Sequence, residues 1–578
     1  MRPLDWIVLC AALGFIVVYG VWKGRRNRNL DSFILADREM KWWTIAISIM
    51  ATQASAITFL STPGQAYADG MRFIQFYLGL PIAMVILSVT AVPIFHRLKV
   101  YTAYEYLEGR FDLKTRTLAA GLFLIQRGMS TGITIYAPSL IISVLLGWNI
   151  YLTNVVIGVL VITYTATGGS KAVSWTHFQQ MIIILGGMLV ALVVAVNSLP
   201  KDISFREAAF VAGKMGRLNA IDFSFDLTNR YNFWSGLIGG LFVALSYFGT
   251  DQSQVQRYLT GETEAQSRMG LLFNGLVKVP MQFFILFVGA MVFVFYQFIT
   301  PPLYFNSSET LKIRSSPYAF EFASLEEEHR TVHYEKQISL QGLIRAVRAG
   351  QDDKVSEAES RVRGDQSRAA AIKQRAIALF KKNDPAADTS DTNYIFLTFV
   401  IRFLPAGLVG LVMAAILSAS MSSTASGLNS LASSTAVDIY KRLVAKDASE
   451  EHYVLFSKLA TVFWGLFAIA FATFANRLGS LIEAVNILGS LFYGTILGIF
   501  LLAFYFKSVR GTPAFIGAII GEIAVLYCFK FTAISFLWYN VVGCAVGVGA
   551  ALLLNAVMPP PPGIELSARS RSPLPAGE

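Results

Sequence analysis

The feature that constrains this chain most is a repeated run of apolar residues, each about as long as a membrane is thick. A helix needs ~20 predominantly apolar residues to cross ~30 Å of hydrocarbon. Such runs follow one another from near the N-terminus to Met558, with short polar loops between them. Only 15% of the 578 residues are charged, against roughly a quarter in an average soluble domain. The sequence therefore predicts an all-α polytopic membrane protein.

The apolar runs predict about thirteen transmembrane helices. We expect the first to be a retained helix rather than a signal peptide, because basic residues follow it and no small-residue cleavage site ends it. The expected helices lie near residues 4–22, 42–68, 72–95, 115–146, 149–167, 176–198, 233–253, 269–299, 404–438, 453–475, 481–506, 512–531 and 533–556.

The basic residues indicate how the helices are oriented. The net charge is +11, but these side chains gather in short loops, which is typical of cytoplasmic loops rather than of a nucleic-acid-binding surface. The N-terminus is then outside and the C-terminus in the cytoplasm of a cell whose inner (plasma) membrane holds the protein. The loops concerned carry Lys23/Arg25/Arg26/Arg28, His96/Arg97/Lys99, Lys171, Arg257/Arg268, Lys441/Arg442 and Lys507/Arg510.

The polar stretches divide the chain. Residues 1–300 form a first transmembrane part and residues 391–558 a second. Between them, residues 301–390 are rich in Glu, Lys, Arg and Ala, and predict an extracytoplasmic insertion of amphipathic helices without chemistry of its own. Residues 559–578, rich in Pro and Ser, predict a disordered cytoplasmic tail.

Two of the expected helices, the second (42–68) and the seventh (233–253), carry small and polar residues where a simple anchor carries Leu and Ile. Broken helices of this composition provide unwound backbone for a binding site at the centre of the membrane. Close helix packing through small residues is the alternative. Each of the two begins a run of five helices, so helices 2–6 and 7–11 are expected to form inverted repeats.

The ninth expected helix (404–438) is unusually rich in hydroxyl side chains. Buried hydroxyls need partners, and hard cations such as Na⁺ prefer oxygen ligands. A serine-rich helix facing an unwound one satisfies both needs, although a lone serine usually bonds to its own helix. The hydroxyls are Ser418, Ser420, Ser422, Ser423, Thr424, Ser426, Ser430, Ser433 and Ser434.

Several ordered motifs make the chain similar to the sodium:solute symporter family. They cover essentially everything except residues 301–390 and the tail, which makes them more specific than one short pattern. The resemblance implies the leucine-transporter type of fold. The motifs are SAITFLSTPGQAYADG at 55–70, YTAYEYLEGRFDLKTR at 101–116, YTATGGSKAVSWTHFQQ at 164–180, TDQSQVQRYLTG at 250–261, MSSTASGLNS at 421–430 and DIYKR at 438–442.

The resemblance also implies a sodium site. By position, it uses the backbone carbonyls of Ala51, Ala54 and Ala419 and the hydroxyls of Ser422 and Ser423. Some members bind a second sodium through an Asp and a further hydroxyl. Here those positions hold His177 and Ala425, neither of which is a good sodium ligand. We therefore expect one sodium ion in each transport cycle.

The solute is harder to predict. Sugar-carrying members use polar side chains at positions that here hold Ile57, Thr58 and Ala244, which disfavours a sugar. Arg127 is an intramembrane charge that favours an anionic solute, such as a monocarboxylate or a sugar acid, unless Asp251 neutralises it. Helix packing is the alternative role for Phe73, Gln75 and Tyr247. The candidate contacts are Gln53, Ser55, Thr58, Phe73, Gln75, Arg127, Tyr247 and Lys278.

Together these features predict a sodium-coupled symporter of a small organic solute that works by alternating access, with Na⁺ as its coupling ion and no organic cofactor. We expect it to contact membrane lipid, to bind no nucleic acid and to function as a monomer. No nucleophilic triad, phosphate loop or metal-spaced His/Cys cluster indicates an enzyme. The alternatives are a sodium/sugar symporter, a symporter-like sensor and a passive sodium channel.

Overall fold

The computed structural model describes residues 2–24, 30–385, 387–475 and 479–559. Helices account for nearly all of its regular structure, and one isolated bridge between Met40 and Gly261 is the single β-type pairing among these residues. The prediction of an all-helical chain is therefore confirmed. Most of the expected tail (559–578) and three of the basic residues after the first helix, Arg25, Arg26 and Arg28, lie outside the described residues.

The first half of the chain contains α1 (Pro3–Gly24), α2 (Leu30–Leu35), η1 (Ala36–Arg38), α3 (Trp42–Gln53), α4 (Ala56–Asp69), η2 (Gly70–Tyr77), α5 (Leu80–Val89), α6 (Ala91–Leu98), α7 (Ala103–Arg110), α8 (Leu113–Leu146), α9 (Ile150–Asn197), α10 (Phe205–Lys214), η3 (Ser235–Gly239), α11 (Gly240–Gly249), α12 (Gln252–Leu259) and α13 (Glu264–Phe298). The second half contains α14 (Ser307–Arg314), α15 (Ala319–Arg348), α16 (Asp352–Asn383), α17 (Thr392–Phe403), α18 (Leu408–Ser434), η4 (Thr435–Val444), α19 (Glu450–Ala472), α20 (Leu481–Tyr505), α21 (Gly511–Phe531) and α22 (Phe536–Val557).

Nine helical stretches of the described residues are long and apolar enough to cross a membrane. The number is smaller than thirteen partly because expected helices are merged or interrupted in the structure. The expected helices 149–167 and 176–198 both fall within α9, whose 48 residues would extend ~72 Å if straight. That length is more than twice the thickness of the hydrocarbon, so one membrane crossing does not account for α9. The count of thirteen stays a prediction.

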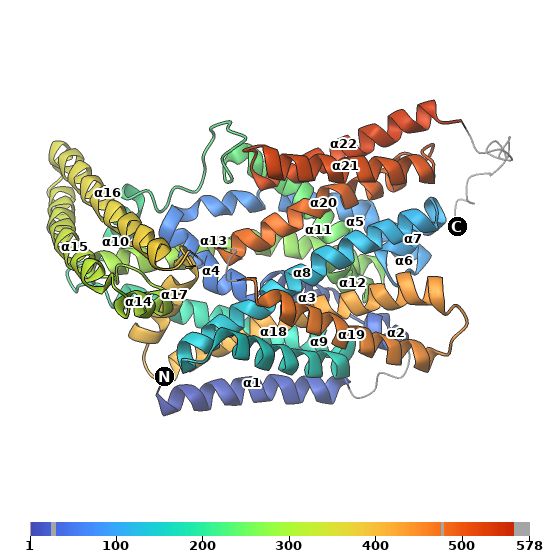
Figure 1. Ribbon diagram of the computed structural model, residues 1–578, viewed down its shortest axis with the longest axis horizontal. Coiled ribbons are helices and arrows are strands. Elements are labelled where there is room, and N and C mark those ends of the chain that lie inside the picture. The colour runs from blue at the N-terminus through green and yellow to red at the C-terminus, as the bar shows by residue number, and fades with distance from the viewer. Residues whose placement is uncertain (1, 25–29, 386, 476–478, 560–578) are drawn as a thin grey trace.

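The long helices run side by side along the longest dimension of the molecule (Figure 1). Helix α1 begins at the end where α14, α15 and α16 lie, and α22 ends at the opposite end (Figure 1). Helices α14–α16 fill most of the polar stretch 301–390 and have a small hydrophobic core of their own, which includes Phe322, Ile372 and Phe380. The ion pairs Arg348–Glu207 and Lys214–Glu359 join this helical insertion to α10 and its flanking residues.

Two interruptions fall inside apolar stretches, in the second and seventh helices expected from the sequence. Helix α3 ends at Gln53 and α4 begins at Ala56, with Ala54 at φ −86° and ψ 75° between them. Helix α11 ends at Gly249 and α12 begins at Gln252, where the Asp251 side chain caps α12. The structure therefore has a break in each of the two segments in which the sequence predicts one.

Glycine allows α4 to pack closely against its neighbours. A Cβ atom at Gly64 would overlap the backbone carbonyl of Thr392 at the start of α17, and a backbone atom cannot swing aside as a side chain can. We expect Gly64→Ala to lower Tm, by an amount corresponding to about 1–3 kcal/mol of overpacking. Gly121→Ala is the matched control, because no atom lies within 4 Å of its Cβ position. Thermal unfolding of the purified variants measures both, and equal Tm values would contradict the packing argument.

Candidate functional site

The break between α3 and α4 releases backbone carbonyls at the centre of the molecule. In an unbroken helix the amide of Ser55 would donate to the carbonyl of Ala51 and that of Thr58 to Ala54. Here the Ser55 amide donates to Gln53 (3.1 Å) and the Thr58 amide to Ser55 (2.9 Å). The Ala51 and Ala54 carbonyls are thus freed from the helical ladder, which makes them available as oxygen ligands.

Helix α18 brings hydroxyl groups to this break. The Ser423 hydroxyl lies 3.4 Å from the Ala51 carbonyl oxygen and 3.1 Å from that of Thr52. The Ser422 hydroxyl is buried without a hydrogen-bond partner among the described residues, and Ala419 lies one turn earlier in the same helix. The structure therefore brings the backbone of α3 and the serines of α18 together, as a sodium site at these residues requires.

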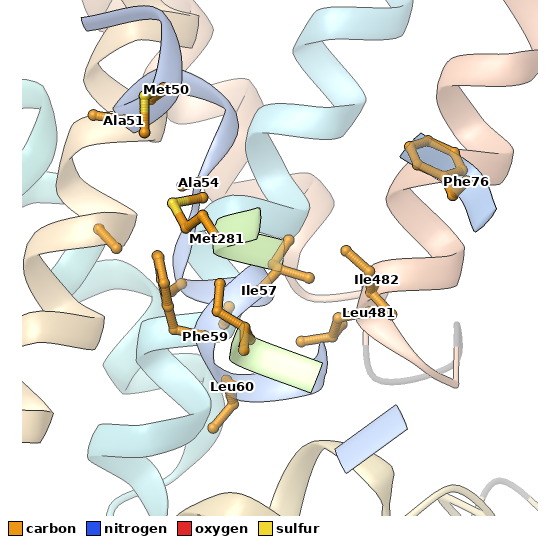
Figure 2. Close-up of a cluster of buried hydrophobic side chains, with 14 of the residues drawn as sticks. Met50, Ala51, Ala54, Ile57, Phe59, Leu60, Phe76, Met281, Leu481 and Ile482 are labelled. Carbon is orange, nitrogen blue, oxygen red and sulfur yellow. The ribbon is translucent and has the colours of Figure 1, made fainter. Parts of the chain in front are cut away.

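Apolar side chains pack against part of the break. Figure 2 shows Ala51 near the end of α3 and Ala54 at the break, with Met281 of α13 beside it. Ile57 and Leu60 continue along α4, all of them almost completely buried. In such surroundings, polar groups left without a partner are costly, so the freed oxygens are expected to bind a ligand or water.

A cavity of about 100 Å³ lies beside the break. Arg127 is the one charged side chain among the described residues that line it. The lining consists of Thr52, Gln53, Ser55, Thr58, Phe76, Tyr77, Leu80, Arg127, Ser130, Thr131, Thr134, Gly240, Val243, Ala244, Tyr247, Phe248, Ser253, Ser423, Ile482, Val485, Asn486 and Tyr493.

Five of the eight candidate substrate contacts line this cavity, namely Gln53, Ser55, Thr58, Arg127 and Tyr247. The other three, Phe73, Gln75 and Lys278, do not. Phe73 packs among aromatic rings, and the Gln75 amide is held by the Tyr231 carbonyl (2.8 Å) and the Asp222 amide (2.9 Å). Lys278 is fully buried, and its Nζ atom lies 5.7 Å from the ring centroid of Tyr77, which does line the cavity.

A polar stripe on α8 also lines the cavity and was not among the residues predicted from the sequence. Ser130, Thr131 and Thr134 follow Arg127 at spacings of three, four and seven residues, so all four side chains share one face of the helix. All three hydroxyls line the cavity. In the sequence, these residues could have been identified by the helical spacing of their hydroxyls next to an intramembrane charge. Asn486 and Tyr493 of α20 share a helix face with Glu483 and Ser490, at spacings of three and four residues, so a similar pattern of polar residues marks them in the sequence.

Arg127 is paired within the protein. Its guanidinium forms an ion pair with Asp251, and the Tyr493 hydroxyl donates to the same carboxylate (3.1 Å). The Tyr247 ring lies 5.5 Å from the guanidinium carbon, and the Tyr247 hydroxyl accepts a hydrogen bond from Gln254 (2.7 Å). The internal pairing with Asp251 that the sequence left open is therefore the one present, and Arg127 does not need an anionic solute for charge balance.

The second break is held differently from the first. The carbonyl of Thr250 accepts a hydrogen bond from the Tyr104 hydroxyl (2.8 Å), and Gln252 bonds to the backbone of Ala103 and Tyr101. The loop helix α7 thus satisfies polar groups at the start of α12. The Thr250 carbonyl at this break is therefore occupied within the protein, unlike the freed carbonyls at the first break.

The two positions expected for a second sodium hold no free oxygen ligand. The His177 ring bonds through Nδ1 to the Ser48 hydroxyl (3.0 Å) and is fully buried. Ala425 packs against Val173 in a small apolar contact. Neither side chain offers an oxygen to a cation.

Comparisons with known proteins are consistent with this arrangement. A family model described as the sodium:solute symporter family matches residues 33–302 and 373–521. The unmatched gap between these ranges falls within the helical insertion.

Curated relatives include the human sodium/iodide cotransporter, 33% identical over 49% of this chain, and mouse sodium-coupled monocarboxylate transporter 2, 32% identical over 45%. The aligned parts span only 44% and 41% of the length of these two relatives. The sodium/sialic acid symporter SiaT of Proteus mirabilis is 25% identical over 93% of this chain and 92% of its own length.

A solved structure of a substrate-bound, outward-open Na⁺-coupled sialic acid symporter has the same fold. Its TM-score is 0.74 at 23% sequence identity, over 97% of this chain and 99% of that chain.

Proposed function

Because the chain belongs to the sodium:solute symporter family, we propose that it is a sodium-coupled symporter that imports a small organic anion by alternating access. The observation that carries the proposal is the break at Ala54, where two carbonyls leave the helical ladder opposite the serines of α18 and next to a cavity lined by polar and aromatic side chains. No chemical reaction is needed for this function.

The sodium ion binds at the break, between α3 and α18. Its ligands are the carbonyl oxygens of Ala51, Ala54 and Ala419 and the hydroxyls of Ser422 and Ser423. Bound sodium fixes the unwound backbone, which carries the cavity-lining residues Gln53, Ser55 and Thr58. Each ligand then raises the affinity for the other, and the downhill entry of sodium drives the uphill entry of the solute.

The solute is a monocarboxylate or a sugar acid. Arg127 is the one charged group in the described lining, its Nε atom has no hydrogen-bond partner, and it lies next to the hydroxyls of Ser130, Thr131 and Thr134. A carboxylate placed there accepts hydrogen bonds from the guanidinium and the Ser130 hydroxyl without displacing Asp251, while the Thr131 and Thr134 hydroxyls donate to backbone carbonyls of α8 (2.7 Å each). The relatives named for monocarboxylates and sialic acid also support an anion.

The architecture that accompanies this function has about thirteen crossings and inverted repeats of helices 2–6 and 7–11. The breaks at Ala54 and at Thr250–Asp251, which fall in the first helix of each proposed repeat, support this proposal. The N-terminus and the helical insertion face outward, and the C-terminus lies in the cytoplasm of a cell bounded by this membrane.

Binding measurements test the proposal before any transport assay. The Tm of the detergent-purified protein is measured with sugars, sugar acids, monocarboxylates, amino acids and halides, each in Na⁺ and in K⁺. A rise in Tm that requires both Na⁺ and an organic anion supports coupled binding. Increases in Tm that are equal in Na⁺ and in K⁺ favour a sensor or a facilitator. An increase in Tm with sugars alone favours the sodium/sugar symporter.

We also expect one sodium ion per cycle. The initial rate of solute uptake into proteoliposomes, measured against sodium concentration, then follows a Hill coefficient near 1, since His177 and Ala425 provide no second set of oxygen ligands. A clearly sigmoidal dependence would contradict the single-site assignment. The variant Ala425→Ser is the control that tests whether an added hydroxyl raises the coefficient.

A further inference from the structure

Helix α18 contacts α8 through a small polar face of its own. Ser420, Thr424 and Gly427 recur at spacings of four and three residues, so they share one side of α18. The Thr424 hydroxyl donates to the hydroxyl oxygen of Thr134 in α8 (2.9 Å), and the Ser420 hydroxyl donates to the carbonyl oxygen of Thr134 (2.7 Å). Ser420, Thr424 and Thr134 are all buried. One residue of α8 is thus tied twice to α18.

Thr134 also belongs to the solute cavity, which it lines together with Ser130 and Thr131. Its hydroxyl donates to the Thr131 carbonyl (2.7 Å), so the hydrogen bonds run in one direction, from Thr424 through Thr134 to Thr131. Each hydroxyl in such a chain polarises the next. Glycine brings the two helices close at the following turn, because a Cβ atom at Gly427 would lie 2.7 Å from the Thr131 hydroxyl oxygen. The polar stripe of α8 therefore rests directly on α18.

The same two turns of α18 carry residues of the proposed sodium site. Ser423 comes directly before Thr424, and its hydroxyl lies 3.4 Å from the Ala51 carbonyl oxygen at the break. Ala419 comes directly before Ser420. Successive residues of a helix point about 100° apart, so one residue of each pair faces α3 while the next faces α8. A displacement of this part of α18 therefore acts on the break and on the cavity together.

We propose that Thr424 and Thr134 are positioning residues that couple the sodium site to the α8 side of the solute cavity. The inference rests on the proposed function and adds a second route of coupling to the one through the unwound backbone of α3 and α4. Sodium holds α18 at Ser423, the hydrogen bonds to Thr134 hold α8, and Ser130 is thereby held where a solute carboxylate accepts its hydrogen bond. A solute that holds α8 favours sodium binding by the same contacts, as linkage requires.

Cysteine labelling with sodium as the only ligand tests this route. Ser130→Cys reports on the α8 side of the cavity and Thr58→Cys on the α4 side, since both residues line it. The purified full-length variants react with the uncharged reagent methyl methanethiosulfonate in Na⁺ or in K⁺ at equal ionic strength, and mass spectrometry follows the peptide that carries the new cysteine. We expect sodium to lower both labelling rates by about fivefold or more. Adding Thr424→Val, which removes the donor to Thr134, should abolish the sodium effect at Ser130→Cys and leave it at Thr58→Cys.

Two further variants show whether the hydroxyl itself is responsible. Thr424→Ser keeps the donor and should restore the sodium effect at Ser130→Cys. Thr461→Val makes the same change as Thr424→Val at a buried threonine of α19, whose hydroxyl donates to the Ser457 carbonyl (2.9 Å), and should leave both labelling positions unaffected.

Each other outcome overturns the inference. A sodium effect at Ser130→Cys that survives Thr424→Val shows that the hydrogen bond to Thr134 does not carry the coupling. Loss of the effect at both labelling positions shows that Thr424→Val damages the sodium site itself. A Tm that is higher in Na⁺ than in K⁺, with no sodium effect on labelling of Ser130→Cys, overturns this route and leaves the proposed function standing. Absence of any sodium effect on Tm or on labelling overturns both.

Discussion

Replacing Asp251 by Asn is expected to destabilise the protein strongly and to abolish transport. The side chain of Asp251 is 1% exposed and that of Arg127 is 11% exposed, and the substitution leaves the guanidinium without a counter-ion. Removing one member of a buried ion pair typically costs about 3–5 kcal/mol, because the remaining charge stays buried and unpaired. The Tyr493 hydroxyl and the cap of α12 lose their charged acceptor as well. Thermal unfolding and solute uptake measure the two effects.

The double variant Arg127→Gln/Asp251→Asn is the matched control for this pair. It removes both charges together, so its Tm should exceed that of Asp251→Asn alone. Glu264→Gln provides the comparison at an exposed pair, since Glu264 and Arg268 are each 41% exposed and such pairs contribute about 1 kcal/mol or less. If the single and double variants unfold at the same temperature, the uncompensated charge of Arg127 is not what destabilises Asp251→Asn.

Replacing Ser423 by Ala should raise the sodium concentration that gives half-maximal uptake by about tenfold or more. The Ser423 hydroxyl lies next to the freed Ala51 and Thr52 carbonyls, and a polar contact to a charged group contributes about 1.5–3 kcal/mol. Because the side chain is only partly buried and its removal leaves little void, the amount of folded protein should stay near that of the wild type. Sodium-dependent uptake at saturating solute measures the effect.

Ser430→Ala makes the same change on the same helix without touching the break. The Ser430 hydroxyl donates to the Gly427 carbonyl (2.8 Å) within α18, so its loss should leave the sodium dependence unchanged. Equal sodium affinity in Ser423→Ala and the wild type would show that Ser423 is not a ligand. A loss of affinity in both variants would point to helix α18 as a whole rather than to one hydroxyl.

The sequence by itself determined the class of fold and the two helices that are broken. Apolar runs of membrane length leave few options, because only helices satisfy every backbone group within the bilayer without a closed barrel. Small and polar residues around Ala54 and Thr250 marked the breaks, and the density of serines in α18 marked the hydroxyl-rich partner. These patterns are local, so a single sequence carries them.

Only the tertiary structure decided which side chains meet. It paired Arg127 with Asp251, placed Tyr493 beside them, and moved Phe73, Gln75 and Lys278 out of the cavity lining. It also buried Arg257, whose three guanidinium nitrogens have no hydrogen-bond partner among the described residues. Pairings of this kind join residues more than a hundred positions apart in the chain. They depend on how helices rotate and cross, which the period of hydrophobicity does not specify in a helix that is apolar on nearly all sides.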